Sequence, residues 1–104
     1  MAERVRIAGV SEIPPGTSRE FAVSGRVVAV FNVDGVVHAM DGVCPHAGGP
    51  LGEGQLNGNI VTCPWHGWQF DVETGRHCLN PNLVHAIFAV SIEGEDIYLE
   101  LPEA

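Results

Sequence analysis

Residues 44–68 read CPHAGGPLGEGQLNGNIVTCPWHGW, and this stretch determines how the rest of the chain is interpreted. It begins with a Cys-x-His pair, Cys44 and His46, and ends with a Cys-x-x-His pair, Cys63 and His66. Thiolate and neutral imidazole are ligands for zinc, copper and iron, and two of each complete a four-ligand set. The pattern therefore predicts a metal site built from two loops.

The way the ligands are shared between the loops separates one kind of metal site from another. A single zinc ion usually takes its cysteines from one Cys-x(2–4)-Cys unit and its histidines from elsewhere in the chain. Here each loop offers one cysteine and one histidine, so two facing loops can give both thiolates to one iron and both imidazoles to a second. This arrangement favours a two-iron, two-sulfide cluster over a structural zinc site.

Two short segments, CPH at 44–46 and CPWH at 63–66, resemble the ligand boxes of Rieske iron–sulfur proteins. The resemblance extends to the glycines that follow the first box and to GWQFDVETG at 67–75. It implies an all-β fold of stacked antiparallel sheets with a small cluster-binding subdomain. It also implies one [2Fe-2S] cluster, whose ligands are Cys44, His46, Cys63 and His66.

The flanking sequence predicts strands and tight turns. Thirteen glycines and seven prolines are spread among short Val- and Ile-rich runs, which is typical of strands joined by turns. Asp34-Gly35 and Asn57-Gly58 are hairpin signals, and a last hairpin is expected at 94–96. The expected strands are Val5–Ala8, Glu20–Val23, Val27–Val33, Val36–Met40, Asn59–Thr62, Gln69–Asp71, Val84–Ile92 and Ile97–Leu101.

The length of 104 residues predicts a single domain. The segment 42–71 is richer in Gly, Pro, Cys, His and Trp than its flanks, so we expect it to form the cluster-binding subdomain. It would be inserted in a β scaffold made of residues 1–41 and 72–104.

Charge and hydropathy exclude several classes of partner. Five basic and thirteen acidic side chains give a formal charge of -8, which repels nucleic acid phosphates and anionic lipid headgroups. No apolar run approaches the roughly 20 residues of a membrane span, and MAERVRIAGV carries charges where a signal peptide needs an apolar region. The expectation is a soluble, cytoplasmic protein.

The sequence departs from one branch of the resembled family. Rieske proteins of quinol-oxidising complexes carry an extra cysteine in each loop, and the two form a disulfide; the corresponding positions here are Gly49 and Trp65. That branch also donates hydrogen bonds to its cluster from a serine and a tyrosine hydroxyl, where this chain has Trp68 and Phe70. Because such bonds stabilise the more negative reduced cluster, their absence predicts a midpoint potential below about 0 mV.

A low-potential protein of this size resembles the ferredoxins of aromatic-ring-hydroxylating dioxygenase systems. The resemblance implies a one-electron carrier, and not an enzyme, that takes electrons from a flavoprotein reductase and gives them to a terminal oxygenase. A small Rieske-like subunit of a nitrite reductase is the first alternative, because it resembles this fold at similar length. A structural zinc-binding protein is the second.

Five further residues are expected near the cluster. Gly48 and Gly49 allow the first loop's backbone to approach the cluster and donate N–H bonds. Trp65 and Trp68 flank the second ligand pair and either shield the cluster or form a docking surface, with ordinary packing as the competing interpretation. Pro81 lies in a third loop that the resemblance places over the cluster, with a plain turn as the alternative.

The other cysteine and the other histidines are expected to be structural. Cys78 has no neighbouring ligand box, which favours a small buried core residue over a redox thiol. His38 alternates with apolar neighbours, His77 lies beside a turn, and His85 begins the expected last long strand.

Overall fold

A computed structural model describes residues 3–44, 48–65, 67–80 and 82–101. Within these residues the chain forms nine strands and two single turns of 3-10 helix, which confirms the all-β expectation. Neither turn in the described part of the chain is long or apolar enough to cross a membrane. The elements are β1 (Glu3–Gly9), η1 (Val10–Glu12), β2 (Ser18–Val23), β3 (Arg26–Val33), β4 (Val36–Asp41), η2 (Leu51–Glu53), β5 (Gln55–Asn57), β6 (Ile60–Thr62), β7 (Gln69–Asp71), β8 (Ile87–Glu93) and β9 (Asp96–Leu101).

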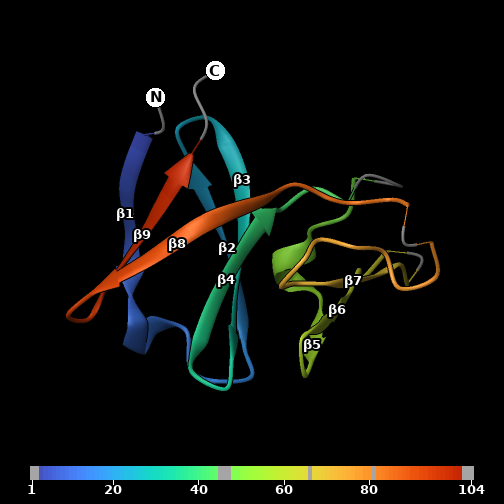
Figure 1. Ribbon diagram of the computed structural model, residues 1–104, viewed down its shortest axis with the longest axis horizontal. Helices are drawn as coiled ribbons and strands as arrows, with labels where there is room; N and C mark the ends of the chain where they lie inside the picture. Colours follow the sequence, from blue (N-terminus) through green and yellow to red (C-terminus); the bar gives the residue numbers. More distant parts are fainter. Residues whose placement is uncertain (1–2, 45–47, 66, 81, 102–104) are drawn as a thin grey trace.

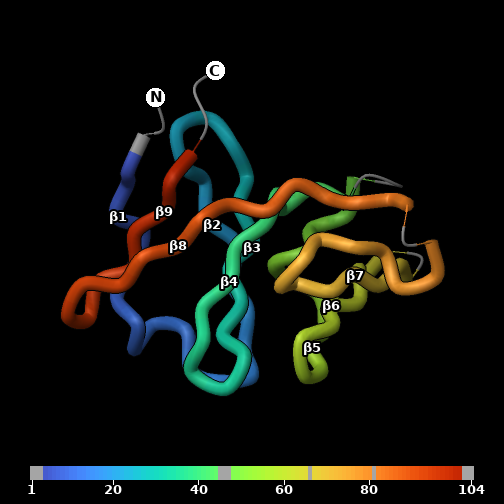
Figure 2. The backbone as a smooth tube through the Cα atoms, viewed as in Figure 1, coloured from blue at the N-terminus to red at the C-terminus, as the bar shows by residue number. Residues whose placement is uncertain are grey.

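The strands form two antiparallel sheets of unequal size (Figure 1). The large sheet has six strands in the order β1-β9-β8-β4-β3-β2, and the small sheet has three in the order β5-β6-β7. Figure 2 shows the chain leaving β7 and crossing back to β8, so the small sheet lies between two halves of the large one in sequence.

Hairpin turns fix the register of neighbouring strands. Asp34 and Gly35 have φ of 51° and 93°, the double positive φ of a tight two-residue turn, and they join β3 to β4 as predicted. Ser24 and Gly25 make the same kind of turn between β2 and β3, a turn that was not predicted from the sequence. The hairpin predicted around Gly58 joins β5 to β6.

Strand β3 is buried on both faces. Val28 and Val30 point into a core shared with β8 and β9, whereas Ala29 and Phe31 point into a second core beneath the small sheet. Successive side chains of a strand face opposite sides, so the continuous apolar run of β3 serves both cores at once. Side chains of β3 and of its neighbour β4, both interior strands of the large sheet, therefore pack against the small sheet.

Two expectations about the strands need correction. Strand β5 was not predicted, because Gln55–Asn57 is short and mostly polar, and it forms only through pairing with β6. Strand β8 begins at Ile87 and not at Val84. Val84 instead pairs with Arg76 within the β7–β8 connection, and the Asp41 N–H donates to the Ala86 carbonyl at 2.9 Å, which extends the β4–β8 pairing ahead of β8.

Turn η2, which directly precedes the first strand of the small sheet, packs against β2 of the large sheet. A Cβ at Gly52 would lie 2.8 Å from Glu20 Cβ and 2.9 Å from Glu20 N, so only glycine allows this approach. The Ser18 hydroxyl donates to the Gly52 carbonyl at 3.0 Å across the same contact.

This contact predicts that Gly52→Ala destabilises the folded protein. The added methyl group forces η2 away from the β2 backbone, and overpacking of this kind costs about 1–3 kcal/mol. Chemical denaturation of the purified protein measures the change. Gly9→Ala is the matched control, because a Cβ at Gly9 has no neighbour closer than 3.6 Å, and equal losses in the two variants would contradict the prediction.

Candidate metal centre

The two cysteine boxes lie in loops that are closed in the same way. The Cys44 N–H donates to the Gly49 carbonyl at 2.9 Å, and the Cys63 N–H donates to the Trp68 carbonyl at 2.7 Å. Each bond joins a cysteine to the residue five positions later, so both loops begin at a cysteine and span six residues. We call residues 44–49 the first ligand loop and residues 63–68 the second.

Each ligand loop has a left-handed glycine at its fifth position. Gly48 has φ of 74° and Gly67 has φ of 73°, a backbone conformation that other residues rarely adopt. In the first loop the Gly48 N–H also donates to the Cys44 carbonyl at 2.8 Å. The expected role of Gly48 in shaping the first loop agrees with this geometry.

Cys44 and Cys63 converge in the core beneath the small sheet. Each is 1% exposed, and both belong to the cluster of buried side chains that includes Leu51, Val61 and Phe70. Burial raises the pKa of the Cys63 thiol, a backbone hydrogen bond from Trp65 lowers it, and the hydrogen-bonded Cys44 side chain raises it again. The two side chains are hydrogen-bonded to each other and are not joined by a disulfide.

This thiol pair fits one half of the predicted ligand set. Two buried sulfurs at hydrogen-bonding distance can bind one iron, and a metal replaces their protons because thiolate is the ligand form. The predicted partners His46 and His66 lie outside the described residues, as does Pro81. Within residues 3–44, 48–65, 67–80 and 82–101 no three metal-ligating side chains come together, so the histidine half stays a prediction.

Gly49 brings the two ligand loops into contact. A Cβ at this position would lie 2.8 Å from Cys63 Sγ and 3.1 Å from Trp65 Cβ. The two positions that resembled the disulfide cysteines of the quinol-oxidising branch are thus direct neighbours, and here they hold a glycine and a tryptophan. The absence of a side chain on Gly49 leaves the space that the Cys63 sulfur occupies.

The two tryptophans of the second ligand loop have different surroundings. Trp65 is 51% exposed, which suits a surface position beside the loops. Trp68 is partly buried and packs against the core that contains both cysteines, with its ring centroid 6.3 Å from that of Phe70. The shielding role considered for both tryptophans fits Trp68 better, and the docking role fits Trp65 better.

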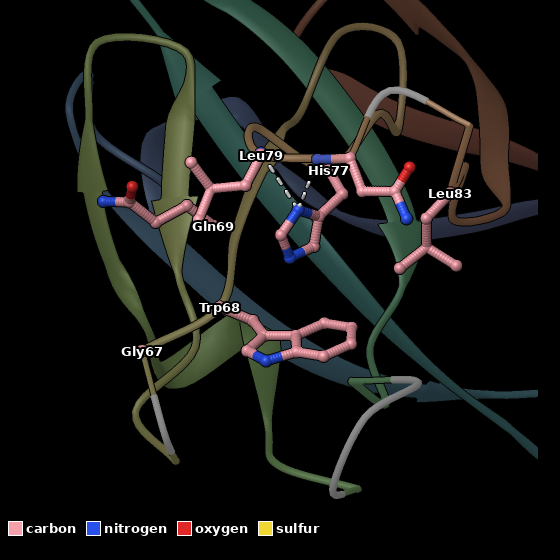
Figure 3. A pocket seen from close by; sticks show the side chains of 7 residues that line it. Gly67, Trp68, Gln69, His77, Leu79 and Leu83 are labelled. Atoms are coloured by element: carbon pink, nitrogen blue, oxygen red, sulfur yellow. Dashed lines mark hydrogen bonds between the residues drawn. The ribbon is translucent and has the colours of Figure 1, made fainter.

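His77, expected from its sequence position to be structural, lies close to the core that contains both cysteines. It is buried, and its ring lies edge-on to Trp68 at 4.7 Å and to Phe70 at 5.2 Å between ring centroids. It also lines a cavity of about 320 Å³ behind the second ligand loop (Figure 3). The lining residues are Gly67, Trp68, Gln69, His77, Leu79, Asn80 and Leu83.

Cys78 is exposed, so the expectation of a buried core residue was wrong. Its N–H donates to the Gln69 carbonyl at 2.9 Å, which places residues 77 and 78 along the edge of β7 as an added extended segment. Neighbours in an extended segment face opposite sides. Because His77 takes the inner side, Cys78 faces the polar outer surface of the small sheet, beside Thr62 and Gln69.

The close approach at Gly49 predicts that Gly49→Ala prevents cluster binding. The methyl group would overlap the Cys63 sulfur, so we expect iron and acid-labile sulfide per chain to fall at least about tenfold. Gly25→Ala, in the β2–β3 turn away from both ligand loops, is the control, since it adds only backbone strain of roughly 1–2 kcal/mol and its Cβ would have no atom within 4 Å. Full iron and sulfide content in Gly49→Ala would contradict the interpretation.

The exposure of Cys78 predicts selective labelling of the native protein. A maleimide should modify Cys78 alone, while Cys44 and Cys63 react only after unfolding and metal removal. Partial burial and, second, the nearby Asp71 carboxylate raise the pKa of the Cys78 thiol. Its thiolate fraction at neutral pH is therefore low, and labelling should be slower than for a small-peptide cysteine and accelerate as pH rises. Mass spectrometry of the labelled protein would refute this if Cys44 or Cys63 reacted first.

Comparisons with known proteins identify similar chains that belong to one family of iron–sulfur proteins. Residues 3–92 match the family model of the Rieske [2Fe-2S] domain. The ferredoxin component of the naphthalene 1,2-dioxygenase system of Pseudomonas aeruginosa is 34% identical over 91 residues, covering 86% of this chain and 88% of that protein. The carbazole 1,9a-dioxygenase ferredoxin of Nocardioides aromaticivorans IC177 has a TM-score of 0.86 and 31% identity, over 96% of this chain and 98% of its own.

A third similarity is to a complex of reduced oxygenase and oxidised ferredoxin in carbazole 1,9a-dioxygenase, with a TM-score of 0.86 and 29% identity over 93% of this chain and 92% of that one. A nitrite reductase NADPH small-subunit structure shares the fold alone, with a TM-score of 0.79 and 17% identity over 93% and 97% of the two chains. The matched residues include both cysteine loops, the small sheet and the large sheet apart from β9 and the end of β8. The chain belongs to the Rieske [2Fe-2S] domain family.

Proposed function

We propose that this protein is a low-potential one-electron carrier that serves a ring-hydroxylating dioxygenase system. In this role it accepts an electron from a flavoprotein reductase and passes it to a terminal oxygenase, and catalysis takes place on the oxygenase. The relatives named as ferredoxin components support the role, as does the complex of a similar ferredoxin with its oxygenase. The observation that carries the proposal is the pair of buried, unbridged cysteines at the junction of two matched loops.

Cys44 and Cys63 would hold one iron of the [2Fe-2S] cluster, and His46 and His66 the other. The convergence of the two thiols supports the first half of this assignment. When bound, the cluster supplies a site that accepts and releases single electrons. The protein's own residues keep water and charge away from the sulfur side, because the surrounding core consists of apolar side chains such as Leu51, Val61 and Phe70.

The proposed potential follows from charge and hydrogen bonding. With two thiolates and two neutral imidazoles the oxidised cluster carries no net charge, so its potential lies above the roughly -400 mV of four-cysteine plant-type ferredoxins. Phe70 is fully buried beside both cysteines and has no hydroxyl to donate. Gly49 and Trp65 replace the bracing disulfide. Both features favour the lower part of the Rieske range of about -150 to +300 mV.

The architecture of the carrier supports a compact cluster-binding unit. We propose that residues 42–71 form this subdomain, inserted in a scaffold of residues 1–41 and 72–104 within one domain. The cytoplasm is the expected location, because a flavoprotein reductase would supply the electrons. The acidic surplus favours basic docking patches on both partners. Three of the five arginines are already paired on the surface, Arg4 with Glu93, Arg6 with Asp96 and Arg19 with Glu12.

The alternatives are less well supported. The nitrite reductase small subunit shares the fold at 17% identity, which says nothing about a shared activity. Membership of the Rieske [2Fe-2S] family sets the structural zinc site aside. Purification with a large sirohaem subunit would favour the first alternative over a mobile carrier.

Redox titration monitored by electron paramagnetic resonance tests the proposed function. The reduced protein should give a mixed-valent [2Fe-2S] signal that appears with a one-electron midpoint below about 0 mV. The same sample should be reduced by NADH through an aromatic-dioxygenase flavoprotein reductase. A colourless, zinc-containing protein or a midpoint above about +200 mV would overturn the proposal.

A further inference from the structure

The segment between β7 and β8 contains a loop that is closed by its own hydrogen bonds. The His77 N–H donates to the Leu83 carbonyl at 2.9 Å, and the Leu83 N–H donates to the Asn80 carbonyl at 2.9 Å. The Asn82 N–H donates to Asn80 Oδ1 at 3.2 Å. We call residues 77–83 the third loop; residue 81 lies outside its described part.

The imidazole of His77 accepts hydrogen bonds from the backbone of this loop. Its Nδ1 accepts the Leu79 N–H at 3.0 Å and the Asn80 N–H at 3.2 Å (Figure 3). Both partners are donors, so Nδ1 carries no proton and the ring proton is on Nε2. A single neutral side chain thus satisfies two successive backbone N–H groups.

Burial of side chains does little to hold the third loop in place. Leu79 is 89% exposed, and Asn80 and Asn82 are also exposed. The cavity of about 320 Å³ lies between the loop and Trp68, so the loop is not packed tightly onto the surface below it. Its conformation therefore depends on polar bonds, of which His77 supplies two.

The other side of the His77 ring connects the third loop to the ligand centre. The ring is edge-on to Trp68, at 88° between ring planes, and to Phe70, at 84°. The Trp68 carbonyl in turn accepts the Cys63 N–H at 2.7 Å. A continuous series of contacts runs from the third loop through His77 and Trp68 to the backbone of Cys63.

We propose that His77 is a positioning residue that locks the third loop against the second ligand loop and thereby sets how much water reaches the cluster side of Trp68. Nδ1 of His77 fixes the conformation of the third loop by accepting two of its N–H groups, and the ring holds the loop beside Trp68 through its edge-on contact. The redox part of this inference rests on the proposed electron-carrier function, whereas the loop-ordering part does not. Because water stabilises the more negative reduced state, release of the loop raises the midpoint potential.

Two substitutions separate the two roles of the ring. His77→Phe keeps the aromatic contacts with Trp68 and Phe70 but removes the acceptor. His77→Asn places an amide oxygen near the position of Nδ1 and keeps the acceptor but removes the ring. His38→Phe, on β4 of the large sheet, is the matched control for a histidine outside the loop.

Hydrogen exchange of the holoprotein, resolved to residues 77–83, reads the loop directly. We expect the Leu79 and Asn80 amides to exchange at least about tenfold faster in His77→Phe, because both of their hydrogen bonds to His77 Nδ1 are lost. In His77→Asn and His38→Phe they should stay within about threefold of the unsubstituted protein. Thermal unfolding confirms that each variant is folded; if His77→Phe fails to fold, the same comparison is made with His77→Leu.

Measurement of the midpoint potential tests whether the third loop affects the ligand centre. It should move to more positive values in His77→Phe and stay unchanged in His38→Phe. Unchanged exchange in His77→Phe, or equal acceleration in His77→Phe and His77→Asn, would overturn the acceptor role. Faster exchange with an unmoved potential would overturn the link to the cluster. A parent protein that binds no [2Fe-2S] cluster would instead refute the proposed function, and the exchange comparison would still decide the loop-ordering role.

Discussion

The burial of β3 on both faces is the constraint on which the rest of this structure depends. Val28 and Val30 fill the core of the large sheet, and Ala29 and Phe31 fill the core under the small one. The small sheet has only three short strands, too few to form a stable unit without a hydrophobic surface to cover. The large sheet supplies that surface, and Cys44 and Cys63 are buried in the same core. The two ligand loops are therefore positioned by the scaffold rather than by the loops alone.

The two ligand loops have different sequences but the same backbone features. Each begins at a cysteine, is closed by a bond to the residue five positions on, and has a left-handed glycine at its fifth position. The loops meet at Gly49, where the missing side chain makes room for the Cys63 sulfur. The quinol-oxidising branch that this chain resembles in its ligand boxes joins the two loops at this junction by a disulfide. Here close packing of a glycine against Trp65 takes its place.

The electrostatics of the centre are those of a low-charge site in an apolar setting. Both sulfurs are buried among aliphatic and aromatic side chains, and burial raises the pKa of the Cys63 thiol in the metal-free chain. Two thiolates suit this setting when a metal neutralises them, because an isolated buried charge is costly. The acidic surplus lies on the surface, because none of the described aspartates and glutamates is buried and none belongs to the core that contains both cysteines.

The sequence by itself predicted the all-β fold and the Asp34-Gly35 turn, and it singled out the two cysteines that the fold brings together, because each depends on local chemistry or on a distinctive spacing. Strand β5 and the sides faced by His77 and Cys78 were decided by tertiary structure. A three-residue polar strand exists only through its partner, and the pairing of residue 78 with Gln69 at the edge of β7 turns His77 inward and Cys78 outward. Such pairing joins residues that are distant or separated by a turn, so no local pattern records it, and a one-residue change of register exchanges the buried and the exposed side chain.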